Sequence, residues 1–328
     1  MRTRLIHDLS EAASILRRGG LVAFATETVY GLGGNAFNTQ AVAGIFEAKQ
    51  RPHFDPLIVH LADTTSLPLV VNHVPEVAQK LIDRFWPGPL TLVLPKQPEL
   101  SDLVTAGLPS VAVRIPAHPL ARELIRQSGV PIAAPSANPF GRISPTTAQH
   151  VIDFLEGRID AVLDGGNCDV GIESTVLSCS DSGEVRLLRP GGLTIEEIEE
   201  VVGPIVRQQP TILDQNGPQS SPGMLAQHYA PRTPLQIVTD WPQTEDDLAL
   251  GVLSFTPIEN PERYGQVEVL SESGSLPEAT AHFFAALRRL DESPVTRIFA
   301  KAFPEVGLGR ALNDRLHRAA AGTSHSSH

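Results

Sequence analysis

Short apolar runs alternate with amphipathic segments over the first 205 residues, and this alternation limits what the chain can fold into. The amphipathic segments carry helix punctuation, with Pro or a capping residue near the start and Gly just past the end. Expected strands are residues 21–25, 57–61, 90–94, 111–115, 132–134, 161–163, 175–178 and 185–188. Expected helices are residues 10–18, 39–49, 75–85, 119–127, 145–155 and 195–202, the last opened by a Thr194/Glu197 capping box. Some strands follow each other too closely for helical crossovers, so the pattern predicts an α/β domain with a mixed open sheet.

The composition changes at residues 206–234, which are polar, rich in Pro and without periodicity. This stretch is typical of a linker. Beyond it, expected strands at 235–238, 252–255, 267–270 and 297–300 alternate with helical patterns at 245–250, 277–290 and 309–320. We therefore predict a domain at 1–205, a linker at 206–234, a small Rossmann-like parallel-sheet domain at 235–320 and a disordered tail at 321–328.

Composition excludes several classes of protein. The formal net charge of −11 argues against broad, nonspecific binding to nucleic acid. No apolar run is long enough for a signal peptide or a membrane span. The two cysteines form no CxxC pair, so neither a disulfide framework nor a zinc site is expected. These features favour a cytoplasmic protein without a membrane partner.

Residues 26–34 attach a polar, glycine-rich stretch to the end of an apolar run. Such a turn can bring backbone N–H groups close to an anion at a strand end. An ordinary strand-to-helix loop explains the same residues equally well, so this stretch alone decides nothing.

Cationic residues end the helix expected at 39–49. Lys49 and Arg51 are explained either by the helix dipole, which favours cations at a C-terminus, or by a polyphosphate ligand. Arg114 lies within an apolar strand, where it needs a solvated face or a buried partner such as a carboxylate ligand. Small and hydroxyl residues follow other strands, at 134–138, 144–147, 171–175 and 188–192. Because no Ser-His-Asp order, GxSxG elbow, HExxH helix or Walker A loop occurs, we expect chemistry based on positioning and charge stabilisation.

As a set, these motifs resemble the YrdC-like domain of threonylcarbamoyl-AMP synthases. The resemblance rests on the order and spacing of residues 26–33, 49–52, 86–91, 134–138 and 188–191. His228-Tyr229-Ala230-Pro231 and residues 307–315 resemble the two-domain form of the enzyme.

The resemblance implies an L-threonylcarbamoyladenylate synthase, a nucleotidyltransferase. It would make threonylcarbamoyl-AMP and pyrophosphate from L-threonine, bicarbonate or CO2, and ATP, without a covalent enzyme intermediate. The product would feed tRNA threonylcarbamoyladenosine formation by downstream transfer proteins. Because the chain is acidic, its own direct binding to tRNA is expected to be weak or absent. Mg²⁺ would arrive with the ATP phosphates, and no metal site built from protein ligands is expected.

By resemblance, each group of site residues has a role. The threonine-binding residues would be Thr28, His60, Arg114, Ala134 and Ser174, with Arg114 pairing the threonine carboxylate. The nucleotide-binding residues would be Lys49, Arg51, Asp55, Ser110, Ser136, Asn138, Ser144, Arg189, His228 and Tyr229. Lys49 and Arg51 would be catalytic through phosphate contacts, and His228 or Tyr229 would reach over the site, which makes the linker a lid.

Two residues depart from the family pattern, and two other functions compete. Ala25 stands where the family usually has Pro, and Asp55 stands where Asn is common. A carboxylate near phosphates weakens binding unless a cation offsets it, which puts the role of Asp55 in doubt. One alternative is an RNA-binding module of YrdC-like type without adenylation activity. The other is carbamoyl or acyl transfer, but the chain lacks the cysteine-rich zinc modules that accompany it.

Overall fold

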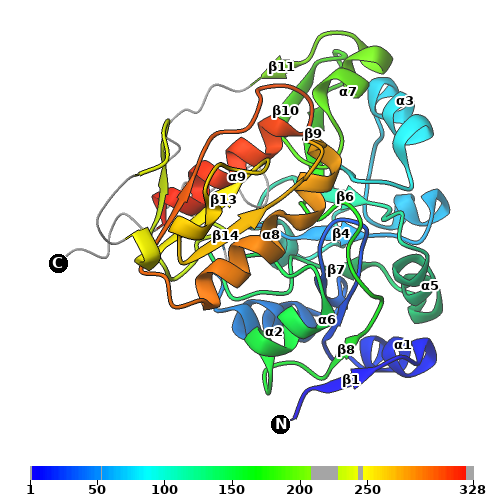
Figure 1. Cartoon of the computed structure of the whole chain (residues 1–328). Helices are drawn as coiled ribbons and strands as arrows, with labels where there is room; N and C mark the ends of the chain where they lie inside the picture. Colours follow the sequence, from blue (N-terminus) through cyan, green and yellow to red (C-terminus); the bar gives the residue numbers. More distant parts are fainter. Residues whose placement is uncertain (1, 53, 208–227, 243–246, 323–328) are drawn as a thin grey trace. The chain divides into compact units, whose positions relative to one another are not determined.

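The computed structural model describes residues 2–52, 54–207, 228–242 and 247–322 (Figure 1). Counting described residues, the chain forms two compact units. The first comprises residues 2–52, 54–140, 145–169 and 173–207, and the second residues 141–144, 170–172, 228–242 and 247–322. Most of the predicted linker, 208–227, and the tail after residue 322 lie outside the described residues.

A mixed sheet forms the centre of the first unit, as the sequence predicted. Its strands are β1 Arg4–Ile6, β2 Val22–Phe24, β3 Gly31–Asn35, β4 Ile58–His60, β5 Leu90–Pro95, β6 Ser110–Arg114, β7 Ile132–Ala133, β8 Ala161–Leu163, β9 Thr175–Cys179, β10 Val185–Arg189 and β11 Val206–Arg207. Across the described residues their order is β1-β8-β2-β3-β7-β4-β6-β5-β9-β10-β11. The sheet is mixed, because it contains parallel pairs such as β4 with β6 and antiparallel pairs such as β4 with β7.

The helices of this unit begin and end at capping residues. They are α1 Leu9–Arg17, α2 Thr39–Lys49, α3 Glu76–Phe85, α4 Asp102–Thr105, α5 Pro119–Ser128, α6 Ala148–Leu155 and α7 Ile195–Val202, with a 3₁₀ turn at Thr64–Leu69. The predicted capping box at Thr194 and Glu197 is confirmed. The expectation that α6 begins at residue 145 is wrong, because the Thr147 side chain accepts from the His150 N–H and caps the helix there.

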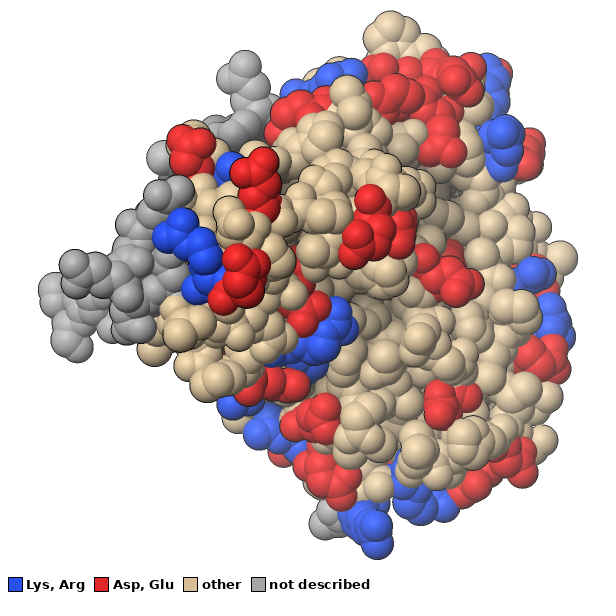
Figure 2. All heavy atoms as spheres, in the orientation of Figure 1, with Lys and Arg blue, Asp and Glu red and all other residues tan. Residues whose placement is uncertain are grey.

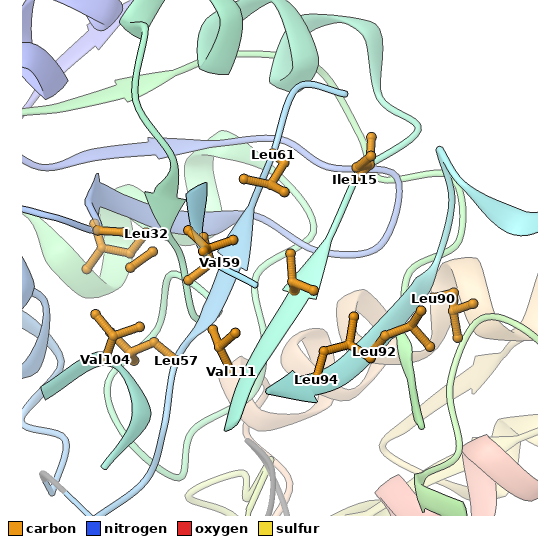
Figure 3. Close-up of a cluster of buried hydrophobic side chains, with 14 of the residues drawn as sticks. Leu32, Leu57, Val59, Leu61, Leu90, Leu92, Leu94, Val104, Val111 and Ile115 are labelled. Carbon is orange, nitrogen blue, oxygen red and sulfur yellow. The ribbon is translucent and has the colours of Figure 1, made fainter. Parts of the chain in front are cut away.

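Side-chain alternation along the strands separates two apolar layers. Val22 and Phe24 of β2 pack with α1 and α5, whereas Ala23 between them packs with the larger core that includes residues of α2 and α3. Figure 3 shows part of this larger core, in which Val59 of β4 and Val111 of β6 lie together. The neighbouring residues His60 and Ser110 therefore point to the opposite face of the sheet.

The glycine-rich stretch contains a strand as well as a turn. Residues 31–35, expected to be a turn, form β3, which pairs antiparallel with both β2 and β7. A Cβ on Gly33 would lie 2.7 Å from a ring carbon of Phe24 and 2.9 Å from a methyl of Ile132. Gly33 is thus needed for close packing inside the sheet, and the true turn is the polar segment 25–30.

The second unit holds a separate parallel sheet of order β12-β15-β13-β14, as predicted. Its strands are β12 Leu235–Ile237, β13 Leu250–Ser254, β14 Gln266–Val269 and β15 Arg297–Ala300. Its helices are α8 Leu276–Glu292 and α9 Gly309–Ala321, with 3₁₀ turns at Asp247–Ala249 and Pro261–Arg263. Residues 245 and 246 of the helix expected at 245–250 lie outside the described residues. The rest of that expectation is wrong, because Asp247–Ala249 form only a 3₁₀ turn, Ala249 accepts from the Thr296 N–H at 2.8 Å, and Leu250 already pairs with Arg297 in the sheet.

Within the described residues, no helix is long and apolar enough to cross a membrane. On the face drawn in Figure 2, basic side chains stand mostly beside acidic ones, without a broad basic area. That face offers no continuous track for a phosphate backbone.

Candidate functional site

The predicted site residues of the first unit lie at two ends of the same strands. His60 and Arg114 are register partners at the carboxyl ends of β4 and β6. Ser110 begins β6, four residues before Arg114, which corresponds to roughly 13 Å along the strand. Ser136 pairs with Gly31 and follows Ile132 by four residues, and Ile132 pairs with His60. Because β7 runs antiparallel to β4, Ser136 lies away from His60, at the Ser110 end. The registers therefore separate a His60/Arg114 end from a Ser110/Ser136 end.

Arg114 is the centre of the first end. Its guanidinium donates from Nε to the Gly88 carbonyl at 3.1 Å and from Nη1 to the Thr28 hydroxyl at 2.8 Å. Its Nη2 lies 2.6 Å from Oε1 of Glu27, and both side chains are buried. A guanidinium has five N–H groups, so one on each terminal nitrogen remains for a substrate carboxylate. Arg114 is thus fixed in place and still able to bind a carboxylate bidentately.

Glu27, which was not among the residues expected from the sequence, belongs to the candidate site through its buried ion pair with Arg114. Burial raises the pKa of its carboxyl, but the Arg114 charge and hydrogen bonds from Arg114 and the Ala117 backbone together outweigh burial and hold the pKa below its ordinary value. The sequence contained a signal for this pair. Arg114 lies in an apolar strand and needs a buried partner, and Glu27 is the one carboxylate in residues 26–34. Glu27 positions Arg114.

Thr28 is oriented by a chain of hydroxyl groups. The Thr26 hydroxyl donates to the Val29 carbonyl at 2.6 Å, so its single proton is used. The Thr28 hydroxyl, 2.8 Å away, therefore donates to Thr26 and accepts from Arg114. This network connects the predicted turn to the Arg114 end of the site.

His60 is buried and uncharged at neutral pH. Burial and, to a smaller extent, the nearby Arg114 charge together lower the pKa of its imidazole to about 3. The ring lies edge-on to Phe24 with centroids 6.3 Å apart, and Nδ1 is 3.3 Å from the Ile58 carbonyl. A neutral ring adds no positive charge to that of Arg114.

The lowered pKa of His60 predicts acid sensitivity of the fold. The unfolded chain protonates this imidazole near pH 6.5, whereas the folded chain resists protonation until about pH 3. Stability is therefore full above the unfolded pKa and is lost as the pH falls, by about 1.5 kcal/mol between roughly pH 6.5 and pH 5. Denaturant unfolding at both pH values measures this loss. His60→Gln should remove this loss of stability, whereas His7→Gln, at an exposed position, should not. Equal pH dependence in the unsubstituted protein and in both variants would contradict the assignment of the loss to His60.

Lys49 belongs to the other end. It is the last residue of α2, is 1% exposed, and donates from Nζ to the carbonyls of Ser136, at 2.5 Å, and Asn138. Burial holds the pKa of its ammonium well below the ordinary value, with Arg51 lowering it and Asp55 raising it. The structure thus brings together Lys49, Ser136 and Asn138, three residues that were each predicted to bind the nucleotide.

Arg51 and Asp55 form a buried ion pair one helical turn apart in sequence. Arg51 Nη2 lies 2.8 Å from Asp55 Oδ2, and the same nitrogen donates to the Pro56 carbonyl at 2.9 Å. The side chains are 4% and 0% exposed. The charge of Asp55, the unusual residue at this position, is therefore offset by Arg51 before any phosphate binds.

Ser174 and Arg189 meet at the start of β9 and the end of β10. Arg189 donates from Nε and Nη2 to the Ser174 carbonyl at 3.2 and 2.9 Å. The Ser174 hydroxyl lies 2.8 Å from the hydroxyl of Thr91. Since Leu90 pairs with Thr175 and Leu92 with Val113, this cluster lies at the Arg114 end of the strands. Ala134, whose N–H donates to Ile58, lies between the two ends.

Three predicted residues belong to the second unit. Ser144 is fully buried there. Tyr229 is 1% exposed, has a left-handed backbone with φ of 63°, and packs against Phe284 with centroids 5.4 Å apart. His228 stacks edge-on with Tyr229 at 4.1 Å. Their contact with a ligand held by the first unit stays a prediction.

Neither cysteine is suited to nucleophilic attack. Burial raises the pKa of the Cys168 thiol far above its ordinary range and that of Cys179 to about 12, so both thiols stay protonated. Among the described residues, no group of three His, Cys, Asp or Glu side chains could hold a metal ion. The arrangement offers cations, hydroxyls and backbone groups for holding and polarising ligands.

Comparison with known proteins agrees with this arrangement. A family model described as "Telomere recombination" matches residues 14–191, and one described as "Threonylcarbamoyl-AMP synthase, C-terminal domain" matches residues 193–321. The chain belongs to the threonylcarbamoyl-AMP synthase family. The resemblance inferred from the motifs is thereby confirmed.

Relatives within this family cover nearly the whole chain. The threonylcarbamoyl-AMP synthase of Bacillus subtilis (strain 168) is 48% identical over 96% of this chain and 93% of its own length. That of Pyrococcus abyssi (strain GE5 / Orsay) is 44% identical over 94% of this chain and 92% of its own. A crystal structure of P. abyssi Sua5 complexed with L-threonine matches with a TM-score of 0.88 and 40% identity, covering 98% of this chain and 97% of that one.

Proposed function

We propose that this chain makes threonylcarbamoyl-AMP and pyrophosphate from L-threonine, bicarbonate and ATP. The observation that carries the proposal is the two-ended site, in which Arg114 keeps two N–H groups for a carboxylate and Lys49 lies at the opposite end of the same strands. Family membership supplies the identity of the substrates. The enzyme is a nucleotidyltransferase, because an adenylyl group moves from pyrophosphate to a carboxylate.

The reaction balances without a covalent bond between the protein and either substrate. The neutral threonine amine attacks the carbon of bicarbonate, and water leaves, whereas attack on CO2 releases a proton and no water. Both routes give N-carboxythreonine. One oxygen of the new carboxylate attacks the ATP α-phosphorus, and the bond to pyrophosphate breaks. Buried, protonated thiols support this route, since no strong protein nucleophile is provided.

Each end of the site serves chiefly one substrate in this proposal, and Arg189 contacts the nucleotide from the Arg114 end. At the first end, Arg114 pairs the threonine carboxylate, Thr28 and His60 offer a hydroxyl and a neutral imidazole, and Ala134 and Ser174 complete the pocket. At the other end, Lys49 and Arg51 stabilise charge on the phosphates during transfer. Further nucleotide contacts are assigned to Asp55, Ser110, Ser136, Asn138, Ser144, Arg189, His228 and Tyr229.

The proposal also covers the metal ion, the lid and the cellular location of the enzyme. Mg²⁺ enters as part of the Mg–ATP substrate, because no described acidic cluster could hold it on the protein. Residues 206–234 serve as a lid through His228 and Tyr229 and shield the labile product from water. We place the enzyme in the cytoplasm, where transfer proteins would carry its product to tRNA. The acidic net charge favours this catalytic role over the alternative of an RNA-binding module.

Pyrophosphate release tests the proposed function. We expect release only when ATP, threonine and bicarbonate are all present, with omission of either threonine or bicarbonate reducing it to background. Detection of threonylcarbamoyl-AMP by mass spectrometry identifies the product. Release that continues without threonine would contradict the synthase assignment, and salt-dependent tRNA binding without any release would favour the RNA-binding alternative.

A further inference from the structure

The second unit contains a cavity that the proposed reaction does not use. Its volume is about 700 Å³, which is in the range of pockets that hold small ligands. Its walls come from the segments that follow β13 and β15, together with Trp241 and Tyr264. All of these segments belong to the second unit, so the cavity is defined within that unit alone.

The cavity lies where the chain changes direction across the sheet. From β13 the chain continues to β14 on one side, whereas the helix after β15, α9, packs against β12 on the other side. β13 and β15 are parallel neighbours, with Val252 opposite Phe299. The segments after them, beginning at Phe255 and Lys301, therefore diverge and leave a crevice between them. Ligands of open α/β sheets bind in this kind of crevice, outside the carboxyl ends of the strands.

Lys301 gives the cavity a positive charge. Its Nζ lies 4.7 Å from the centroid of the Trp241 ring. In the described part of the chain, no carboxylate forms an ion pair with this lysine, and Arg263 supplies a second cation on the cavity wall. A lysine held over an aromatic ring rather than a carboxylate can still neutralise a ligand anion.

Aromatic rings and one carboxylate form the rest of the relevant wall. Phe255 and Phe303 contact each other edge-on at 5.9 Å, and the Tyr264 hydroxyl donates to the Pro242 carbonyl at 3.2 Å, which keeps its ring in the wall. Flat apolar walls suit a flat ring. Glu259 can accept from ligand hydroxyls, as a carboxylate does with ribose in related sheet topologies.

The loop after β13 indicates how an anion would be held. Residues 255–260 contain no glycine, so this loop cannot form the glycine-rich backbone cradle of dinucleotide-binding proteins. Charge recognition must then come from the side chains of Lys301 and Arg263.

We propose that this cavity binds a nucleoside monophosphate, with Lys301 and Arg263 at the phosphate, the aromatic wall at the base and Glu259 at the ribose hydroxyls. The site is separate from the two-ended site of the first unit and does not depend on the proposed reaction. The loop that carries Lys301 is held firmly, because Asn313 of α9 accepts from the Phe303 N–H at 2.8 Å and donates to its carbonyl at 3.0 Å. The cavity is therefore preorganised for its ligand.

Tryptophan fluorescence of the full chain tests the proposal. The chain has two tryptophans, so Trp86→Phe leaves Trp241 as the sole reporter, inside the cavity. Titration of this variant with AMP should change the emission saturably. Adding Lys301→Ala should weaken the affinity about tenfold or more, and adding Lys301→Arg should largely preserve it. Far-UV circular dichroism checks that each variant is folded.

Several results would overturn the proposal. They are the absence of an AMP response of Trp241 up to millimolar concentration, an unchanged affinity after Lys301→Ala, and inorganic phosphate or adenosine binding as tightly as AMP. Adding Lys49→Met separates the two sites: the Trp241 response should persist, and its loss would assign AMP to the first unit instead. A persistent response with no pyrophosphate release in any protein would refute the proposed function and leave this site standing.

Discussion

Replacing Arg114 by Ala should reduce threonine-dependent pyrophosphate release by about a hundred- to a thousandfold. The same change should lower the free energy of unfolding by about 3–5 kcal/mol, because it leaves the buried Glu27 carboxylate without its cation. Steady-state kinetics and denaturant unfolding measure the two effects. Arg126→Ala is the matched control, since Arg126 is an exposed arginine paired with Glu123.

A second substitution separates the structural role of Arg114 from its role in binding. In the Arg114→Ala background, Glu27→Gln removes the uncompensated charge and should recover at least half of the lost stability. Activity should not recover, because no group remains to pair the threonine carboxylate. Recovery of activity together with stability would mean that Arg114 only maintains the fold.

Lys49→Met should reduce pyrophosphate release by a similar factor while leaving the fold largely intact. Methionine keeps the apolar stem, and loss of the two hydrogen bonds to the carbonyls of Ser136 and Asn138 is partly offset because a buried charge is also removed. We expect a stability change of no more than about 2 kcal/mol. Kinetics at varied ATP measures the effect, with exposed Lys80→Met as the control. Wild-type kinetics in Lys49→Met would exclude Lys49 from the phosphate site.

Arg51 differs from Lys49 in this respect. Its partner Asp55 is 0% exposed, so Arg51→Ala would leave a carboxylate in the protein interior without that cation. Loss of activity in Arg51→Ala alone could therefore reflect unfolding, which makes Lys49 the cleaner test of phosphate binding.

Much of the fold could be predicted from local patterns, because apolar runs and helix caps are local features. The expected strand at 161–163 and the helices at 39–49 and 195–202 coincide with β8, α2 and α7. β3 was missed because its glycines resemble a turn in the sequence. The reason for glycine at position 33 is a tertiary contact, because Phe24 and Ile132 occupy the space that a side chain there would need.

The candidate site could be proposed from the sequence as a set of residues, whose roles stay predictions, but not as a geometry. Strand direction and register decide which residues share an end, and neither can be read from single motifs. The pairing of Arg114 with Glu27 and of Arg51 with Asp55 likewise depends on the folded chain. Family resemblance therefore supplied the residues, and the registers supplied their separation into two ends.

The separation of those ends has a use in inhibitor design. Along β6, Ser110 and Arg114 are roughly 13 Å apart, so a single molecule with a carboxylate at one end and a phosphate mimic at the other could engage both ends at once. Tethering makes the second contact intramolecular, with an effective concentration that depends on how well the tether matches the span. A stable analogue with a linker of that length should therefore bind more tightly than either fragment alone.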